Sequence, residues 1–381
     1  MTRLGFFAAF VAGQALAFSV ATDSQGDEVR WRARAEFVLD ERFAAELGLP
    51  EAAADAVVAA ATAYDAQTPA LEVRVHRGAP AALGYSTEPG AKNQSDIVVL
   101  HDWPFSSTAL ATTLVTVNAR TNEIIDADIA LNADAYEFGL VDVPRGDERT
   151  YDVQNTVMHE LGHALGLAHN AEDPGVVMYP GSAPQETCKR RLADDDIAGL
   201  QELYAVDVFG HPELASGCTA APGGLLASWL ALLGALWGAA RRTRRSPPPR
   251  AVRRCVSVGL AVLAVSSQAA EPARAAAVTA PDEVAWAEVV EARSHWLEGT
   301  QLIVTDVEVE VRTCVRGACP TGRLVVQVVG GRVGDLEQYV AHQPKVVKGA
   351  QVLVVKQGAR RRLLSSAPTG ALVAPPGAGS R

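Results

Sequence analysis

The stretch that decides the fold is residues 159–169, which read His-Glu-Leu-Gly-His-Ala-Leu-Gly-Leu-Ala-His. In a helix, residues four apart lie on one face, so His159 and His163 can direct two imidazoles at a single metal ion. Glu160 follows the first of these histidines. Its carboxylate can therefore reach a water on the metal without binding the metal itself.

The second half of the stretch supplies a turn and a third histidine. Gly166 can take the positive φ that ends the helix, and His169 can then return as a third ligand. Three histidines leave one tetrahedral position open, as a catalytic zinc requires and a structural zinc does not. The bland alternative is an ordinary helix that carries these side chains by chance, but the full spacing makes chance much rarer than it is for the short His-Glu-x-x-His form.

Short strand-like and helix-like segments alternate from residue 18 to about residue 208, which predicts an α+β domain. Residues 112–117 and 124–131 resemble a hairpin around Arg120-Thr121-Asn122. We expect strands at 31–38, 71–75, 96–100, 112–117 and 124–131, and helices at 51–67, 152–167 and 194–204.

A methionine segment, Val-Val-Met-Tyr-Pro at residues 176–180, follows His169. The histidine motif followed by this segment resembles the metzincin zinc endopeptidases, and among them the matrixins, the matrix-metalloprotease family, especially its smaller bacterial members. Residues 192–204 resemble the matrixin closing helix, and residues 125–132 resemble a strand common in the bacterial members. The resemblance covers about residues 27–207 and implies a twisted mixed sheet with two long helices and a closing helix.

The resemblance also implies roles for single residues. Met178 would lie beneath the zinc as an apolar floor, beside Tyr179 and Pro180, and would not be a ligand. Tyr179 and the loop 172–185 would border the pocket for the residue after the scissile bond. Thr112, Leu114 and Val117 would lie on an edge strand that pairs with an extended substrate.

The sequence departs from the family pattern at several points. Asn170 follows the third histidine, where matrixins more often have Ser or Thr, and the sequence has no cysteine-switch propeptide motif. His101 lacks the partners of a second zinc site, so we expect a surface or packed histidine there. Asp-rich stretches leave Ca²⁺ binding open, with solvated loop carboxylates as the simpler interpretation.

These observations predict a zinc metalloendopeptidase with one catalytic Zn²⁺ held by His159, His163 and His169. Glu160 would act as the general base and would then deliver the proton to the leaving amine. Substrates would be extracellular proteins or peptides, and the catalytic domain would be monomeric. The rival hypothesis is a non-enzymatic cell-surface binding or adhesion protein with a structural zinc.

The N-terminus carries an export signal. Residues 1–17 have a basic start, an apolar run and a small-x-small end at Ala15-Leu16-Ala17, which is typical of a cleaved secretory signal. An uncleaved anchor is the alternative. The net charge of −10 argues against a nucleic-acid partner.

A second apolar segment follows the predicted protease domain, 18–208, and a linker, 209–222. Residues 223–240 contain no charge and are about 27 Å long as a helix, enough for a transmembrane or sorting helix. The Arg/Pro-rich segment 241–254 comes next, as in a bacterial surface-sorting tail with processing near Cys218. A plain membrane anchor and a buried core helix are the alternatives. We expect the protein at the cell surface or outside the cell.

The rest of the chain resembles a second exported product. Residues 255–270 form a short signal-like apolar segment, so two adjacent coding units read as one chain are one interpretation. We expect a small all-β domain at 277–365, for binding or spacing, and a disordered tail at 366–381. Cys314 and Cys319 are candidates for a disulfide at a hairpin tip.

Overall fold

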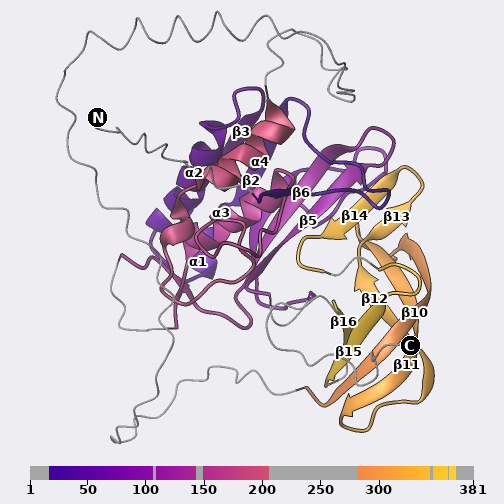
Figure 1. Ribbon diagram of the computed structural model, residues 1–381. Helices are drawn as coiled ribbons and strands as arrows, with labels where there is room; N and C mark the ends of the chain where they lie inside the picture. Colours follow the sequence, from indigo (N-terminus) through magenta and orange to yellow (C-terminus); the bar gives the residue numbers. More distant parts are fainter. Residues whose placement is uncertain are drawn as a thin grey trace, which may run out of the picture. The chain divides into compact units, whose positions relative to one another are not determined.

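A computed structural model describes residues 17–105, 109–142, 149–205, 281–343, 346–358 and 360–365 (Figure 1). All of these residues belong to one of the two compact units into which the chain divides, residues 1–205 together with 261–381. Among the described residues, no helix has both the length and the apolar character needed to cross a membrane. The predicted segments at 209–222, 223–240, 241–254, 255–270 and 366–381 lie outside the described residues, as does the predicted signal 1–17 apart from its last residue, Ala17.

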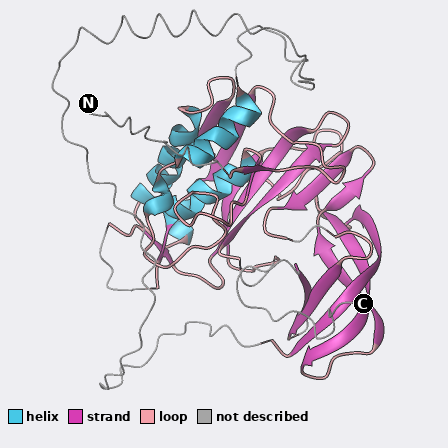
Figure 2. Cartoon of the chain, in the orientation of Figure 1, coloured by secondary structure: helices cyan, strands magenta, loops and turns pink. Residues whose placement is uncertain are grey.

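The N-terminal part, residues 17–205, combines helices with short and long strands (Figure 2). Its helices are α1 (Phe43–Glu46), α2 (Ala52–Asp65), α3 (Val153–Ala164), the short 3-10 helix η1 (Cys188–Arg190) and α4 (Asp194–Tyr204). Its strands are β1 (Ser19–Val20), β2 (Arg34–Asp40), β3 (Glu72–Gly78), β4 (Ser95–Leu100), β5 (Ala111–Asn118), β6 (Glu123–Asn132), β7 (Phe138–Gly139), β8 (Tyr151–Asp152) and β9 (Leu167–Ala168).

The C-terminal part, residues 281–365, is all β, as the sequence predicts. Its strands are β10 (Glu283–Trp296), β11 (Ile303–Arg316), β12 (Gly322–Val329), β13 (Gly331–Val333), β14 (Leu336–Val340), β15 (Gln351–Gln357) and β16 (Arg360–Ser365). Five of these strands form a sheet in the order β12-β11-β10-β15-β16. Valines on alternate positions of β10, β11 and β12 form its apolar core.

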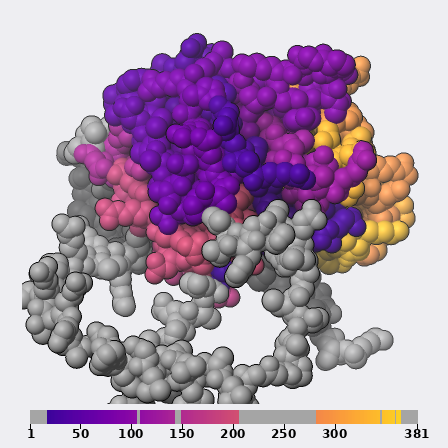
Figure 3. Space-filling model, turned by 90° about the horizontal axis from the view of Figure 1, so that it is seen from above, coloured from indigo at the N-terminus to yellow at the C-terminus, as the bar shows by residue number. Residues whose placement is uncertain are grey.

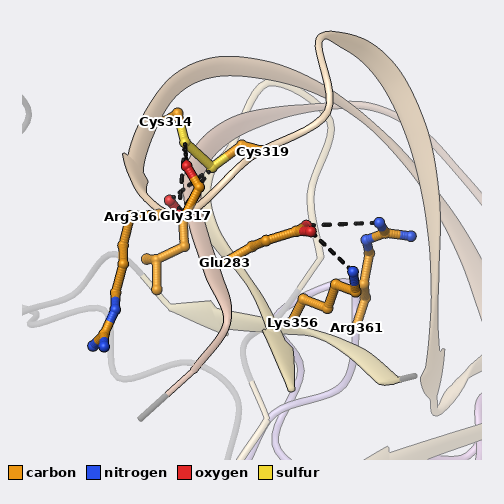
Figure 4. Close-up of a disulfide and its surroundings, with 8 residues drawn as sticks. Glu283, Cys314, Arg316, Gly317, Cys319, Lys356 and Arg361 are labelled. Atoms are coloured by element: carbon orange, nitrogen blue, oxygen red, sulfur yellow. Dashed lines mark hydrogen bonds and ion pairs between the residues drawn. A yellow bond between two sulfur atoms is a disulfide. The ribbon is translucent and has the colours of Figure 1, made fainter. Parts of the chain in front are cut away.

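A disulfide closes one end of this five-stranded sheet (Figure 4). Cys314 lies in β11 and Cys319 lies in the turn before β12, and the structure joins them with a Cα–Cα separation of 5.6 Å. Nearby, the Glu283 carboxylate on β10 pairs with Lys356 Nζ at 2.9 Å and with Arg361 at 3.7 Å. These contacts tie β10 to the neighbouring strands β15 and β16.

The main sheet of the molecule has seven strands in the order β13-β14-β5-β6-β4-β2-β3. Strands β2, β3, β4 and β6 run parallel to one another. Strand β5 pairs antiparallel with β6, as the predicted hairpin requires. The mixed sheet and the three main helices agree with the predicted α+β class. The last two strands, β14 and β13, come from the C-terminal part, which the sequence did not indicate.

Two long helices cover the main sheet because both carry apolar faces. In α2 the buried positions are mostly alanines, with Val57 and Tyr64 among them, so the helix can approach its neighbours closely. In α3 every residue except Gln154 is buried. The Asp152 side chain accepts a hydrogen bond from Asn155 N at 2.8 Å and so caps the first turn of α3.

Candidate active site

The three predicted histidines converge. His159 and His163 lie one turn apart on α3, and His169 follows β9 after the chain has reversed at Gly166, where φ is 91°. The Nε2 atom of His169 lies 3.1 Å from that of His163 and 3.3 Å from that of His159. Three ring nitrogens therefore face one small volume.

The other ring nitrogen of two histidines is held by the backbone. Nδ1 of His159 donates to Val177 O at 2.7 Å, and Nδ1 of His163 donates to Leu167 O at 2.9 Å. With the proton on Nδ1, the lone pair of each ring is on Nε2, which is the tautomer that a metal-binding histidine adopts.

The rings are also uncharged. Burial, together with the neighbouring His342 and His169, lowers the pKa of His163 to about 3. Burial likewise lowers the pKa of His169 to about 3 and that of His159 well below its ordinary value. Neutral imidazoles at neutral pH are the form that binds a divalent cation.

Glu160 lies beside these rings and is held by Thr113 of β5. Thr113 Oγ1 donates to Glu160 Oε2 at 2.8 Å, and both side chains are buried. Burial alone would raise the pKa of Glu160, but the adjacent His342, His163 and the Thr113 hydroxyl outweigh it and lower the pKa. The carboxylate is therefore ionised and ready to accept a proton. Thr112 and Leu114 on this strand were predicted as site residues from the sequence, whereas Thr113 was not.

A fourth histidine, His342, joins the group from the C-terminal part. Its Nε2 lies 3.2 Å from Glu160 Oε1, and its ring stacks on that of His159 at 5.4 Å. The four histidines each offer a ring nitrogen, and these nitrogens all lie within 4.8 Å of one another. His342 was not predicted as a site residue, because it stands alone in the sequence, far from the motif.

The segment around Met178 packs under α3. A Cβ atom on Gly162 would lie 2.3 Å from Met178 Sδ, so only glycine fits at that position of the helix. The Asp196 carboxylate on α4 accepts hydrogen bonds from Val177 N at 3.0 Å and Met178 N at 3.1 Å. Met178 therefore lies against the histidine helix, where the resemblance places it, and α4 holds its backbone.

The loop after Met178 is held by a buried lysine. Lys189 Nζ donates to Tyr179 O at 2.7 Å and to Gly181 O at 2.5 Å, on either side of Pro180. Burial lowers the pKa of Lys189. The lysine fixes the course of residues 179–181, and nothing in the sequence pattern indicated it.

The predicted substrate strand, β5, is buried along its length, including Thr112, Leu114 and Val117. It pairs with β6 on one side and with β14 on the other. In this chain the position expected for an extended substrate is therefore held by β14. His101, which we expected at the surface or packed, is exposed and lies 3.1 Å from Glu46 Oε2.

The residues present fit a zinc ion. Neutral imidazoles with Nε2 lone pairs directed at a common point are nitrogen donors of the kind that Zn²⁺ prefers. Within the described ranges, these four histidines are the cluster with the side chains and spacing to hold a metal. Calcium binding stays a prediction.

Comparison with known proteins supports the same class. Residues 52–205 match the matrixin family, Peptidase_M10. The chain is 37% identical over 83 residues to metalloendoproteinase 1 of Glycine max, covering 22% of this chain and 27% of that protein. It is 46% identical over 56 residues to human neutrophil collagenase, covering 15% and 12%, and 48% identical over 46 residues to human matrilysin, covering 12% and 17%.

Residues 52–205 are thus similar in sequence to the matrixin family, and these relatives include metalloendoproteinases. The chain spans about a quarter or less of the length of these relatives. Whether it is of bacterial type, and whether it ends its first half in a sorting signal, stay predictions.

Proposed function

We propose that this protein is a zinc-dependent endopeptidase that hydrolyses peptide bonds in extracellular proteins. The observation that carries the proposal is the convergence of His159, His163 and His169 next to the ionised, buried Glu160. A bound zinc would supply Lewis-acid chemistry, polarising the scissile carbonyl and making a water more acidic.

The protein side chains have distinct parts in this reaction. The three histidines would hold the ion through Nε2, and the carbonyl oxygens of Val177 and Leu167 orient two of the rings. Glu160 takes the water proton on its carboxylate and passes it to the leaving nitrogen. Thr113 Oγ1 holds the second oxygen of that carboxylate in place.

The substrate would bind as an extended strand next to Thr112, Leu114 and Val117 through main-chain hydrogen bonds, and it would need the edge of β5 that β14 pairs with in this structure. Loop 172–185, with Tyr179, would border the pocket beyond the scissile bond. Export, and attachment to a membrane through residues 223–240, belong to the same proposal and rest on the sequence alone.

Glu160→Gln tests the proposed chemistry. The change keeps the size of the side chain but removes its ability to accept a proton, so zinc content should stay near one ion per chain while casein cleavage falls by about a hundredfold or more. Zinc is measured by mass spectrometry of the metal. Because His342 contacts Glu160, cleavage is measured with and without an added His342→Ala change.

Near-normal turnover by metal-loaded Glu160→Gln protein would refute the role of Glu160. A chelator should abolish cleavage and added zinc should restore it, whereas cleavage that resists chelation would point to another nucleophile.

The rival function, a non-enzymatic surface module with a structural zinc, is favoured by one observation. His342 completes a set of four imidazoles, and a closed four-ligand site is typical of structural zinc. The two functions predict different effects of removing His342. Only an enzyme would gain peptide cleavage when the fourth ligand position of the zinc becomes open.

A further inference from the structure

We propose that the C-terminal part of this chain is a built-in inhibitor of its own protease domain. In this inference β14 takes the place of a substrate strand on β5, and His342 takes the fourth ligand position at the zinc. The inference rests on the proposed function, because it assigns a regulator to that same site.

The first support is strand pairing. β14 runs antiparallel to β5, with Leu336 opposite Asn118 and Val340 opposite Leu114. Ala341 N continues the ladder by donating to Thr113 O at 2.9 Å, so the pairing extends to the residue that holds Glu160. Main-chain pairing of this kind is how an extended peptide binds the edge of a sheet. A substrate cannot use an edge that is already paired.

The second support is the position of His342. The residue directly after the last strand hydrogen bond is a histidine, and its ring nitrogen belongs to the group of four within 4.8 Å. Its Nε2 also lies 3.2 Å from Glu160 Oε1. The imidazole therefore stands at the open ligand position. It also contacts the Glu160 oxygen that would accept the water proton.

The C-terminal strand offers nothing for the enzyme to cut at this point. The group of this strand that contacts the Glu160 carboxylate is the His342 imidazole, at 3.2 Å, and an imidazole has no bond for the base to help hydrolyse. The segment is also held at both ends, because β12 precedes the hairpin and β15 follows it within the five-stranded sheet. The strand can therefore block the site without being released as a product.

Buried polar contacts fix the register of β14. Gln338 is 1% exposed, and its amide donates to Gln301 O at 3.0 Å and to Thr116 Oγ1 at 3.3 Å. The oxygen of the Gln338 amide accepts a hydrogen bond from Ile303 N at 2.6 Å. One side chain thus joins β14 to both β5 and the start of β11. A slip by one residue would turn Gln338 to the opposite face and break these bonds.

Contacts at the ends of β14 add to this specificity. Asp335 pairs with Arg120, and Ser24 Oγ donates to Glu337 Oε2 at 2.7 Å. Val340 is buried in an apolar cluster with Leu114 and Trp103. Figure 3 shows orange and yellow residues of the C-terminal part adjoining residues of the N-terminal part, in agreement with these contacts.

Glycines let the hairpin leave its own sheet. Gly330 and Gly331 have φ of 103° and 135°, and a Cβ on Gly331 would lie 2.3 Å from Ser294 Oγ and from Thr305 Oγ1. Here the chain passes from β12 in the five-stranded sheet to β13 and β14 in the seven-stranded sheet. The turn requires glycine at both positions.

His342→Ala in the full chain tests the inference, with His295→Ala as the matched control. His295 is half exposed on β10, and its Nδ1 lies 3.8 Å from Asp306 Oδ2. X-ray absorption of the zinc-loaded chains counts the coordinating imidazoles, and cleavage of a peptide library gives the activity. We expect four imidazoles and latency in the wild type and in His295→Ala. In His342→Ala we expect three imidazoles and cleavage at least about tenfold faster.

A second variant separates strand pairing from ligation. Ala341→Pro removes the N–H that bonds to Thr113 O and leaves His342 in place. We expect it to raise cleavage above that of the wild type, and circular dichroism shows whether it has folded. Failure of both variants to raise cleavage, with three imidazoles already present in the wild type, would overturn the inference.

The outcomes separate the inference from the proposed function. If His342→Ala binds zinc through three imidazoles but cleaves nothing, the protease hypothesis fails. If the wild type cleaves well and His342→Ala is slower, the protease hypothesis stands, and His342 assists catalysis instead of blocking it.

Discussion

At the scale of single residues, the site depends on how Glu160 is held. Its carboxylate has Thr113 on one oxygen and His342 on the other. Burial has the largest effect on the pKa of Glu160 and raises it. His342, His163 and the Thr113 hydroxyl, in this order, each lower it. A buried hydrogen bond to a charged group contributes about 1.5–3 kcal/mol, so Thr113 should matter for both position and ionisation.

Thr113→Val should therefore slow cleavage by about tenfold and change its pH dependence. Removal of the hydroxyl raises the pKa of Glu160, so the base becomes protonated at a higher pH. The acid limb of the pH–rate profile therefore shifts to higher pH. The profile is measured in a His342→Ala background, with Thr62→Val at an exposed position of α2 as control. An unchanged acid limb would show that Thr113 does not position Glu160.

At the scale of elements, α4 holds the Met178 segment from a distance. The Asp196 carboxylate accepts three backbone hydrogen bonds, from Val177, Met178 and Ala193. Burial raises the pKa of Asp196, and these hydrogen bonds act against the rise. The first turn of a helix thus orders the floor of the histidine site.

Asp196→Ala should lower the free energy of unfolding by about 1–3 kcal/mol, because three buried N–H groups lose their acceptor. Urea denaturation of the zinc-free chain measures the change apart from metal binding. Asp194→Ala, at an exposed position in the same turn, should lower the free energy of unfolding by only about 0.3 kcal/mol. Equal losses in the two variants would mean that only helix electrostatics are involved.

At the scale of the whole molecule, the two parts are joined by more than the connecting chain. The β5–β14 ladder, the Gln338 hydrogen bonds and the apolar cluster around Val340 all lie between them. Among the described residues of the C-terminal part, 281–365, Cys314 and Cys319 bond to each other and leave no cysteine for a link to the N-terminal part. The two parts can therefore be cut apart cleanly.

A protease recognition sequence inserted between Arg274 and Ala275 makes this cut. We expect the two fragments to elute together from a sizing column and to stay latent, because the interface and not the tether holds them. His342→Ala in the cut chain should be active and still associated. Separation of the fragments on cutting, with full activity, would show that the tether is essential.

The amino-acid sequence by itself determined the local features of this protein. The spacing of His159, His163 and His169 places three ring nitrogens together because a helical turn and one glycine reversal depend only on near neighbours. The helices at 52–65, 153–164 and 194–204 and the strands β2 to β6 were predicted from local sequence patterns for the same reason. The short strands β13 and β14 were not predicted, because glycines interrupt their sequence pattern.

Only the tertiary structure decided what faces the open ligand position. Glu160 and His342 are separated by 182 residues, and Thr113 lies 47 residues before Glu160, so no local pattern relates them. Their meeting depends on the register of β14 on β5, which is set by long-range hydrogen bonds and packing. Pairing between distant strands leaves no periodic signal in the sequence, and so it becomes visible only once the chain is folded.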